Sequence, residues 1–307
     1  MNYTLHQLQI FLKVTQLKSI TKASEALFLS QPAVSIQLKK FQEQFSIPLT
    51  EVVGRQLYVT DFGFEIAEAA EKILNEVQAI NYKTLSFKGQ IAGRLKLSIV
   101  STGKYVMPYF LSDFTNKNKG VDLIIDVTNK SSVIQSLERN EVDFALVSVI
   151  PAQLNLERVQ LMENKLFLIG GAKLKFNKKV ASKKIFEEYP LIYREEGSAT
   201  RKAMEEFLSS KDLSTRKKME LTSNEALKQA VIAGLGLSIM PLIGIKNELK
   251  NGDLQIIPFK GLPIVTNWNL VWQKSKKLSP TAMAYLDFIR TEKDRIIQEN
   301  YDWYKAY

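Results

Sequence analysis

"SITKASEALFLSQPAVSIQLKKFQEQFSIPL" (residues 19–49) contains two short helical patterns that are separated by about three residues. Ser19 or Thr21 can cap the first helix, and Ser30 can cap the second. Pro32 falls in the first turn of the second helix, where its missing N–H costs nothing. The apolar residues of the second helix recur at spacings of 4, 3 and 4 and predict one buried stripe, made of Val34, Leu38, Phe41 and Phe45.

Two helices joined this closely, the second capped and amphipathic, predict a helix-turn-helix. In that motif the second helix lies in the major groove of DNA, with its N-terminal residues on base edges. The outward side of residues 31–45 offers amides and a hydroxyl for base edges, lysines for phosphates and one apolar side chain for a thymine methyl. The candidate DNA contacts on this helix are Gln31, Ser35, Ile36, Gln37 and Lys40, beside Lys39. A helical hairpin with a polar, solvated side fits the periodicity equally well.

The segment "LTEVVGRQLYVT" (49–60) predicts two short strands around a turn at Gly54 and Arg55. Beside a helix-turn-helix, such a hairpin can act as a wing, with Arg55 entering a minor groove or gripping a phosphate. The hairpin therefore favours the DNA-binding interpretation over the plain helical hairpin.

Residues 61–89 change to a heptad pattern, in which apolar residues alternate at spacings of 4 and 3 while the glutamates lie off the seam. The seam consists of Ile66, Ala70, Ile73, Val77, Ile80, Thr84 and Phe87. We interpret it as a dimerising helix, because the seam is narrow and no neighbouring sequence offers an obvious cover. Such a helix supports the DNA-binding interpretation, since paired DNA readers bind paired half-sites. The alternative is a single amphipathic helix that lies on its own domain.

From residue 93 onward, predicted strands and helices alternate, as in "RLKLSIV" (94–100), "VDLIIDV" (121–127) and "VDFALVSV" (142–149). A second round of alternation follows, and then "TNWNLVWQ" (266–273) and a last helix from Ser279. This order predicts an α/β architecture of parallel strands in two lobes joined by crossovers. The aromatic tail "NYDWYKAY" has no predicted place and could pack on a domain or on a partner chain.

Composition narrows the function classes. The chain has 307 residues, a net charge of +10, no cysteine and one histidine, His6. Disulfides, thiolate metal sites and cysteine nucleophiles are excluded, and catalysis by histidine is disfavoured. No GxGxxG or GxxxxGK[ST] phosphate loop is present. We therefore expect no enzyme, no cofactor and no metal, and, without a signal peptide or an apolar run long enough for a membrane helix, a cytoplasmic protein.

The N-terminal stretch quoted first, followed by "GRQLYVTDFG" (54–63), resembles the DNA-binding domain of the LysR-type transcriptional regulators. Later segments resemble the same family in the right order: "STGKYVMPYFLSDF" (101–114), "NEVDFALVS" (140–148), "EEGSATRKAMEEFL" (195–208) and "NEALKQAVIAGLGLSIMPLIGIKNELKNGDL" (224–254). The resemblance implies a winged helix-turn-helix, a linker helix and a two-lobed effector domain like the periplasmic binding proteins. It also implies homotetramers built as dimers of dimers, an interrupted palindrome in double-stranded DNA as target, and control by a small co-inducer. RNA polymerase is a further candidate partner.

By position, the resemblance assigns DNA reading to Gln31, Pro32 and Ser35 and the wing arginine to Arg55. Two residues depart from the family pattern. The position of Ile36 often holds arginine or another polar residue, so a guanine contact is in doubt and a thymine methyl is favoured. Thr50 replaces a usual phenylalanine, which could change how the wing packs.

Ligands of open α/β lobes bind beyond the carboxyl ends of the strands, where helix N-termini suit anions. Small polar residues occur at several such points, and the effector cleft of the family is lined by corresponding segments. The candidate effector contacts are Ser101, Thr102, Asn129, Ser131, Ser148, Ser198, Thr200 and Thr222. The alternative for each of them is a plain N-cap, although Ser101 and Thr102 together favour ligand contact. The predicted effector is a small anionic metabolite.

The expected fold class is therefore α/β, with an N-terminal winged helix-turn-helix over 1–60, a linker helix over 61–89 and an effector domain over 93–300. Lobe I is expected over about 93–163 and 266–300, and lobe II over about 164–265. The predicted function is sequence-specific transcriptional regulation under control of the effector. The first rival is an enzyme of the same α/β fold, for which no nucleophile–base set with histidine can be assembled. The second is a solute-binding protein, which would need a signal sequence and has no use for residues 1–90.

Overall fold

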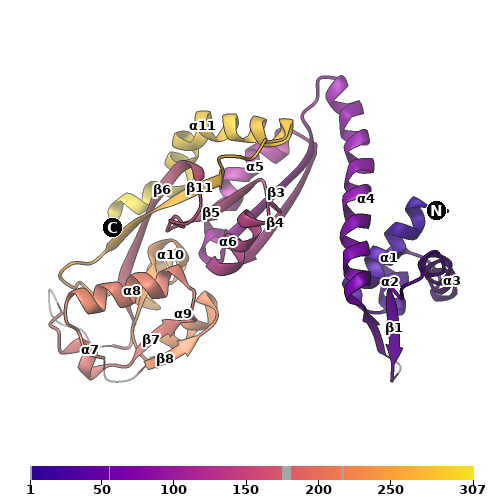
Figure 1. Ribbon diagram of the computed structural model, residues 1–307. Coiled ribbons are helices and arrows are strands. Elements are labelled where there is room, and N and C mark those ends of the chain that lie inside the picture. Colours follow the sequence, from indigo (N-terminus) through magenta and orange to yellow (C-terminus); the bar gives the residue numbers. More distant parts are fainter. Residues whose placement is uncertain (1, 55, 175–180, 216–217) are drawn as a thin grey trace. The chain divides into compact units, whose positions relative to one another are not determined.

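The computed structural model describes residues 2–54, 56–174, 181–215 and 218–307 (Figure 1). The chain divides into two compact units, residues 1–90 and residues 91–307. Arg55, the predicted wing arginine, lies outside the described residues. Within the described ranges, every helix is too short or too polar to cross a lipid bilayer.

The N-terminal unit combines three short helices, a two-stranded hairpin and one long helix (Figure 1). Its elements are α1 (Leu5–Leu17), α2 (Ile20–Leu27), α3 (Gln31–Gln42), β1 (Thr50–Val53), β2 (Gln56–Val59) and α4 (Asp61–Phe87). The side chains of Thr4, Ser19 and Ser30 cap the three short helices, each by accepting a hydrogen bond from a backbone N–H in the first turn. The expected helix-turn-helix and hairpin are thus both present.

Aromatic rings form the centre of the N-terminal unit. Phe41 of α3 is fully buried, and its ring centroid lies 5.1 Å from those of Phe11 and Phe45. Phe45, the last residue of the predicted stripe, follows the end of α3 and reaches the core from the next turn. Ala67 and Ala70 of α4 are buried in the same core, so the start of the long helix is part of this unit.

The C-terminal unit is built on a seven-stranded sheet with the order β10-β6-β11-β5-β3-β4, in which β9 also pairs with β6. Its strands are β3 (Ala92–Val100), β4 (Gly120–Thr128), β5 (Phe144–Val147), β6 (Leu156–Gly171), β7 (Leu191–Arg194), β8 (Lys218–Leu221), β9 (Ser238–Pro241), β10 (Leu254–Ile256) and β11 (Ile264–Gln273). Its helices are α5 (Met107–Lys117), α6 (Lys130–Glu138), α7 (Ile185–Glu188), α8 (Ala199–Ser210), α9 (Asn224–Ile232), α10 (Lys246–Asn251) and α11 (Pro280–Tyr301). Short 3-10 turns are η1 (Ser101–Tyr105), η2 (Leu242–Gly244) and η3 (Asp302–Ala306).

The sheet is mixed, whereas the sequence predicted parallel strands. β3 runs parallel to β4 and β5, and β7 runs parallel to β8. β6 and β11, however, are antiparallel to each other and to their other neighbours. The reason is the order of the chain: β6 leads from β5 toward the elements of residues 185–256, and β11 returns from them to α11, so the two long strands run in opposite directions.

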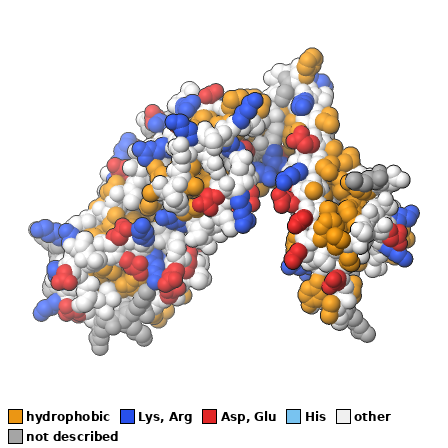
Figure 2. Space-filling view, viewed as in Figure 1, with side chains coloured by type: hydrophobic (Ala, Val, Ile, Leu, Met, Phe, Trp, Pro, Cys, Tyr) orange, Lys and Arg blue, Asp and Glu red, His pale blue; other side chains and the backbone are white. Residues whose placement is uncertain are grey.

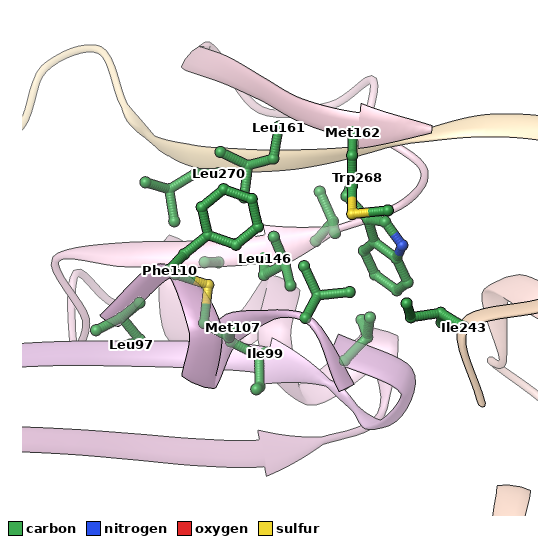
Figure 3. Packing of buried hydrophobic residues seen from close by; sticks show 14 of the residues in the cluster. Leu97, Ile99, Met107, Phe110, Leu146, Leu161, Met162, Ile243, Trp268 and Leu270 are labelled. Atoms are coloured by element: carbon green, nitrogen blue, oxygen red, sulfur yellow. The ribbon is translucent and has the colours of Figure 1, made fainter. Parts of the chain in front are cut away.

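β6 and β11 run between two groups of elements (Figure 1). We call the group of β3, β4, β5, α5, α6 and α11 lobe I and the group of β7, β8, β9 and α7 to α10 lobe II. Figure 3 shows side chains of β3, α5, β5, β6 and β11 packed against one another, with Trp268 at 0% exposure. A second apolar cluster around Phe186 and Phe259 forms the interior of lobe II. The two long strands therefore join lobes that each have a packed interior.

The aromatic tail packs on its own unit. The hydroxyl of Tyr301 donates to the backbone oxygens of Tyr105 and Val106 over 3.1 and 3.2 Å. The hydroxyl of Tyr304 accepts from the backbone N–H of Lys165 over 2.8 Å. The tail is therefore held both to the end of η1 and to the middle of β6.

Candidate functional site

The exposed face of α3 carries the predicted DNA contacts. Gln31, Pro32 and Lys40 are exposed, and Ser35 and Gln37 are half-buried. Ile36 is 54% exposed, an apolar side chain presented to solvent beside polar neighbours. Val34, Leu38 and Phe41 on the opposite side are buried, so the helix has one face in the core and one face available to a ligand.

Two of the glutamines on this face already make hydrogen bonds. Gln7 of α1, itself buried, donates from its amide to the carboxamide oxygen of Gln37 over 3.2 Å. Gln31 donates to the hydroxyl of Ser35 over 3.4 Å. The bond from Gln7 orients the side chain of Gln37, whose amide N–H groups are then the donors that can reach a base.

The wing is attached to α3 through the residue that departs from the family pattern. The hydroxyl of Thr50 in β1 donates to the side-chain oxygen of Gln42 at the end of α3 over 2.7 Å. β1 and β2 pair in antiparallel register from Thr50 and Val59 to Val53 and Gln56. A side-chain hydrogen bond thus replaces the packing of a phenylalanine, and it links the wing to the candidate reading helix.

The seam of α4 is divided into a buried and an exposed part. Ile66 and Ala70 pack in the core of their own unit, which corrects the idea that no part of this chain covers the seam. Further along, Ile73 is 41%, Ile80 61% and Phe87 97% exposed. Figure 2 shows hydrophobic side chains over the surface of this helix. An apolar row exposed to solvent over about four turns is a candidate contact for a second helix.

In the C-terminal unit, five of the eight predicted effector contacts come together where lobe I meets lobe II. Ser101, Thr102, Asn129, Ser198 and Thr200 line one cavity, with Lys130, Arg194 and Glu195. The free space is about 10 Å³, room for about one water molecule. The lobes are thus closed over these residues in this structure.

Arg194 is the central charged group of this cavity. It ends β7, is 3% exposed, and donates to both carboxylate oxygens of Glu195 over 2.7 and 2.6 Å. It also donates across the cavity to the hydroxyl of Ser101 over 3.2 Å, and Ser101 accepts a second bond from Asn224. A buried guanidinium in this setting is a binding group for a carboxylate or phosphate, and here the carboxylate of Glu195 occupies it.

Two larger cavities adjoin this one along α8. One, of about 480 Å³, is lined by Lys130, Ser131 and Lys202, and the other, of about 510 Å³, by Lys202, Val149 and Thr266. Burial and the nearby positive charge of Lys202 lower the pKa of the Lys130 ammonium. An anion bound beside Lys130 would favour its protonated form and so oppose this lowering.

Several predicted contacts also serve as helix caps. The side chain of Asn129 accepts from the backbone N–H of Ser132, and that of Ser198 from the N–H of Arg201. The plain N-cap alternative therefore holds for both, although both also line the cavity. Arg201 is buried and bonded to Glu205 and Glu220, so its charge is already compensated.

The remaining predicted contacts lie apart from Arg194. Ser131 lines the cavity of about 480 Å³. Ser148 follows β5 and precedes Val149, which lines the cavity of about 510 Å³. Thr222 is exposed between β8 and the N-cap of α9. The structure thus places these three at neighbouring surfaces rather than around the buried guanidinium.

Family models match both units. The model described as "Bacterial regulatory helix-turn-helix protein, lysR family" matches residues 5–64, and the model described as "LysR substrate binding domain" matches residues 88–294. The chain belongs to the LysR family. This is a family of transcriptional regulators rather than of enzymes.

Curated relatives of this LysR-family protein match over nearly its whole length. The HTH-type transcriptional activator CmpR of Synechocystis sp. is 36% identical over 290 residues, 94% of this chain and 95% of the relative. A RuBisCO operon transcriptional regulator of Allochromatium vinosum is 36% identical over 298 residues, 96% of this chain and 98% of the relative.

Solved structures show the same folds. The CcmR regulatory domain of Synechocystis PCC6803 in complex with 2-PG is 29% identical, covers 64% of this chain and 95% of that one, and has a TM-score of 0.61. Full-length CbnR in complex with its target DNA, 17% identical, covers 94% of this chain and 99% of that one with a TM-score of 0.72. The second likeness concerns the fold alone.

Sequence reasoning missed the charged groups of the cleft in this LysR-family protein. The predicted contacts were small polar residues after strands and so did not include the charged residues Arg194, Glu195 and Lys130. Arg194 does carry a signal: it directly follows the apolar run "PLIY" (190–193), at the carboxyl end of a predicted strand. Its neighbour Ser101, 93 residues away, could not be inferred from that position.

Proposed function

We propose that the protein is a sequence-specific DNA-binding regulator whose activity is set by a small anion bound between the two lobes. The observation that carries this is the guanidinium of Arg194, which is 3% exposed and bonded to Ser101 of the other lobe. Glu195 holds this guanidinium in the structure, and an anion that displaces Glu195 or binds beside it would pair with the same buried positive charge. A ligand there contacts both lobes, so it changes the free energy of their closed arrangement.

The effector class follows from the donors around the cleft. Arg194 offers a planar pair of N–H donors, and Lys130 a point charge whose pKa is lowered by burial and by the positive charge of Lys202. Carboxylates and phosphates fit both groups. Because the regulatory domain of the related CcmR was solved with 2-PG, 2-PG is the first compound to test.

On the DNA side, we assign base reading to the exposed face of α3, with Ile36 against a thymine methyl and Lys40 on a phosphate. The exposed seam residues of α4 would pair two chains, so that two copies of α3 read the half-sites of an interrupted palindrome. Tetramers would then form from two such dimers, and contact with RNA polymerase would follow from binding upstream of a promoter. Relatives named for the RuBisCO operon make a RuBisCO promoter the first target to test.

Selection of bound duplexes from a random pool tests the DNA assignment. We expect enrichment of a two-fold symmetric site, with affinity that falls when either half-site is changed. Salt-sensitive binding without sequence preference would instead indicate only a basic protein. If no duplex binds, the remaining function classes are a small-molecule-binding protein and an enzyme.

Calorimetry of the full chain with 2-PG tests the effector assignment. We expect the double variant Ser101→Ala/Thr102→Ala and the variant Arg194→Gln each to lose at least tenfold in affinity, because both remove donors in the cleft. The matched control is Arg139→Gln, which removes an arginine that is 61% exposed in lobe I. Equal affinity of the wild-type chain and the cleft variants would exclude this site.

A further inference from the structure

A second cavity, of about 400 Å³, lies on the other side of η1 from the cleft. We call it the tail pocket, because the C-terminal tail forms one wall. Among its lining residues are Lys104, Tyr105, Tyr109, Lys228, Lys246 and Trp303. Its volume is within the range of small-molecule sites.

Two of its lysines lie over aromatic rings. Lys104 lies with its ammonium 5.0 Å from the ring centroid of Tyr105, and Lys246 lies 4.9 Å from that of Trp303. Both lysines are exposed, and in the described part of the chain neither ammonium is within ion-pair distance of an acidic side chain. Their positive charges are therefore available to a ligand.

The third lysine is different. Lys228 of α9 is buried, and its ammonium lies 3.0 Å from Glu225 and 2.6 Å from Glu248. The two carboxylates exceed the single charge of Lys228, and Glu225 also interacts electrostatically with Lys104, so the three lysines and two glutamates leave a net charge of +1. The pocket therefore favours an anion, held at its rim by two ammonium groups.

The other walls are aromatic. Trp303 is half-buried in the pocket wall, and Tyr109 is 50% exposed with its ring in edge contact with Tyr301. The bonds from Tyr301 to the end of η1 hold this wall in position. Aromatic side chains bind flat rings through their faces and edges. The walls therefore favour a ligand with a flat ring, whereas the lysines favour a ligand with a negative charge.

We propose that the tail pocket is a second small-molecule site, separate from the cleft, which takes an anion that carries a flat ring and is about the size of a nucleoside monophosphate. It is built on the same two elements as the cleft. In η1, Ser101 faces the cleft while Lys104 and Tyr105 line the pocket. In α9, Asn224 bonds Ser101 while Lys228, one turn later, lines the pocket.

The first experiment separates charge from ring. Calorimetry of the full chain uses AMP, adenosine, which has the ring without the phosphate, and ribose 5-phosphate, which has the phosphate without the ring. We expect AMP to bind and the two fragments to bind at least tenfold more weakly. No binding of AMP, or equal binding of ribose 5-phosphate, would overturn the proposal.

Charge reversal locates the site. Lys246→Glu should weaken AMP at least tenfold, whereas Lys250→Glu, an exposed lysine on the same helix, should not. Trp268 and Trp272 are buried, whereas Trp303 lines the pocket. AMP should therefore change the tryptophan emission of the wild type. The variant Trp303→Phe should still bind AMP by calorimetry, but without a change in emission. Unchanged AMP affinity in Lys246→Glu would overturn the assignment.

A last comparison distinguishes this site from the cleft. Arg194→Gln should keep AMP affinity within threefold of the wild type, and 2-PG should not compete with AMP. Loss of AMP binding in Arg194→Gln together with its retention in Lys246→Glu would place AMP in the cleft and overturn the proposal. Failure of 2-PG to bind would count against the proposed effector only, because the AMP measurements do not depend on it.

Discussion

The Nη2 group of Arg194 in lobe II donates a hydrogen bond to Ser101 of lobe I over 3.2 Å, while Nη2 and Nε also donate to Glu195. The same guanidinium thus closes the cleft and holds an internal carboxylate in the place that an external anion would take. An effector must displace Glu195, or bind beside it, to reach the charge of Arg194.

Glu195→Gln should therefore tighten binding of an anionic effector by about three- to tenfold, because a neutral amide competes less well for a guanidinium than a carboxylate does. The same change leaves a buried charge without its counter-charge, which should lower the free energy of unfolding by about 2 kcal/mol. Calorimetry with 2-PG measures the first effect. Urea unfolding measures the second through tryptophan fluorescence, since all three tryptophans lie in the C-terminal unit.

The matched control for that change is Glu141→Gln, an exposed carboxylate 3.9 Å from Arg139. It should leave both quantities unchanged, because exposed ion pairs contribute little. Weaker effector binding in Glu195→Gln would mean that Glu195 assists the ligand rather than competing with it.

Effector binding should depend on pH through Lys130. Burial and Lys202 lower the pKa of Lys130 in the free protein, and a bound anion raises it. Binding should therefore take up protons in the alkaline range in which Lys130 titrates, and affinity should fall as the pH rises through that range. Calorimetry in buffers of different ionisation enthalpy measures the proton uptake. Lys130→Met should abolish it, and uptake that persists in this variant would exclude Lys130 as its source.

Ile36 and Lys40 should affect DNA binding in different ways. Ile36→Ala should cost about 1 kcal/mol, roughly fivefold in affinity, at sites that carry a thymine opposite this residue, with little effect elsewhere. Lys40→Ala should weaken all sequences alike and reduce the slope of log affinity against log salt by about 1. Gel shifts on selected and altered sites at several salt concentrations measure both. A uniform loss in Ile36→Ala would argue against a methyl contact.

Phe28 should be replaceable with a gain in stability. It ends α2 with a φ of 55°, a left-handed conformation that is costly for a bulky residue, and its side chain is 97% exposed. Phe28→Asn keeps a residue that tolerates this conformation and loses no packing. We expect about 1 kcal/mol more stability in the urea transition of the N-terminal unit, followed by circular dichroism. Reduced stability would show that Phe28 makes a contact in solution.

Ile80 should be needed for pairing of two chains. A charge at this exposed seam position, as in Ile80→Glu, would lie in an apolar helix interface and should shift the chain toward monomers in sedimentation experiments. Lys83→Glu, also on α4 but off the seam, is the control and should leave the association state unchanged. If Ile80→Glu associates like the wild type, the seam is not the contact between chains.

Much of the N-terminal unit could be predicted from the sequence because its determinants are local. Ser30 caps α3 through the N–H of a residue three positions away, and Val34, Leu38 and Phe41 define one face by spacing alone. The energies involved act within one or two turns of helix. The hydrogen bond of Gln37 could not be predicted in this way, because its partner Gln7 lies on another helix, 30 residues earlier.

The tertiary structure alone decided the rest. No local pattern indicates that β6 and β11 run antiparallel between the lobes, or that Ile66 and Ala70 turn inward while Ile80 stays exposed. The chemistry of the cleft depends on Arg194 and Ser101, which come within hydrogen-bond distance only after both lobes have packed. Caps and faces follow from near neighbours in the chain, whereas a binding site assembled across a fold follows from the packing of distant segments.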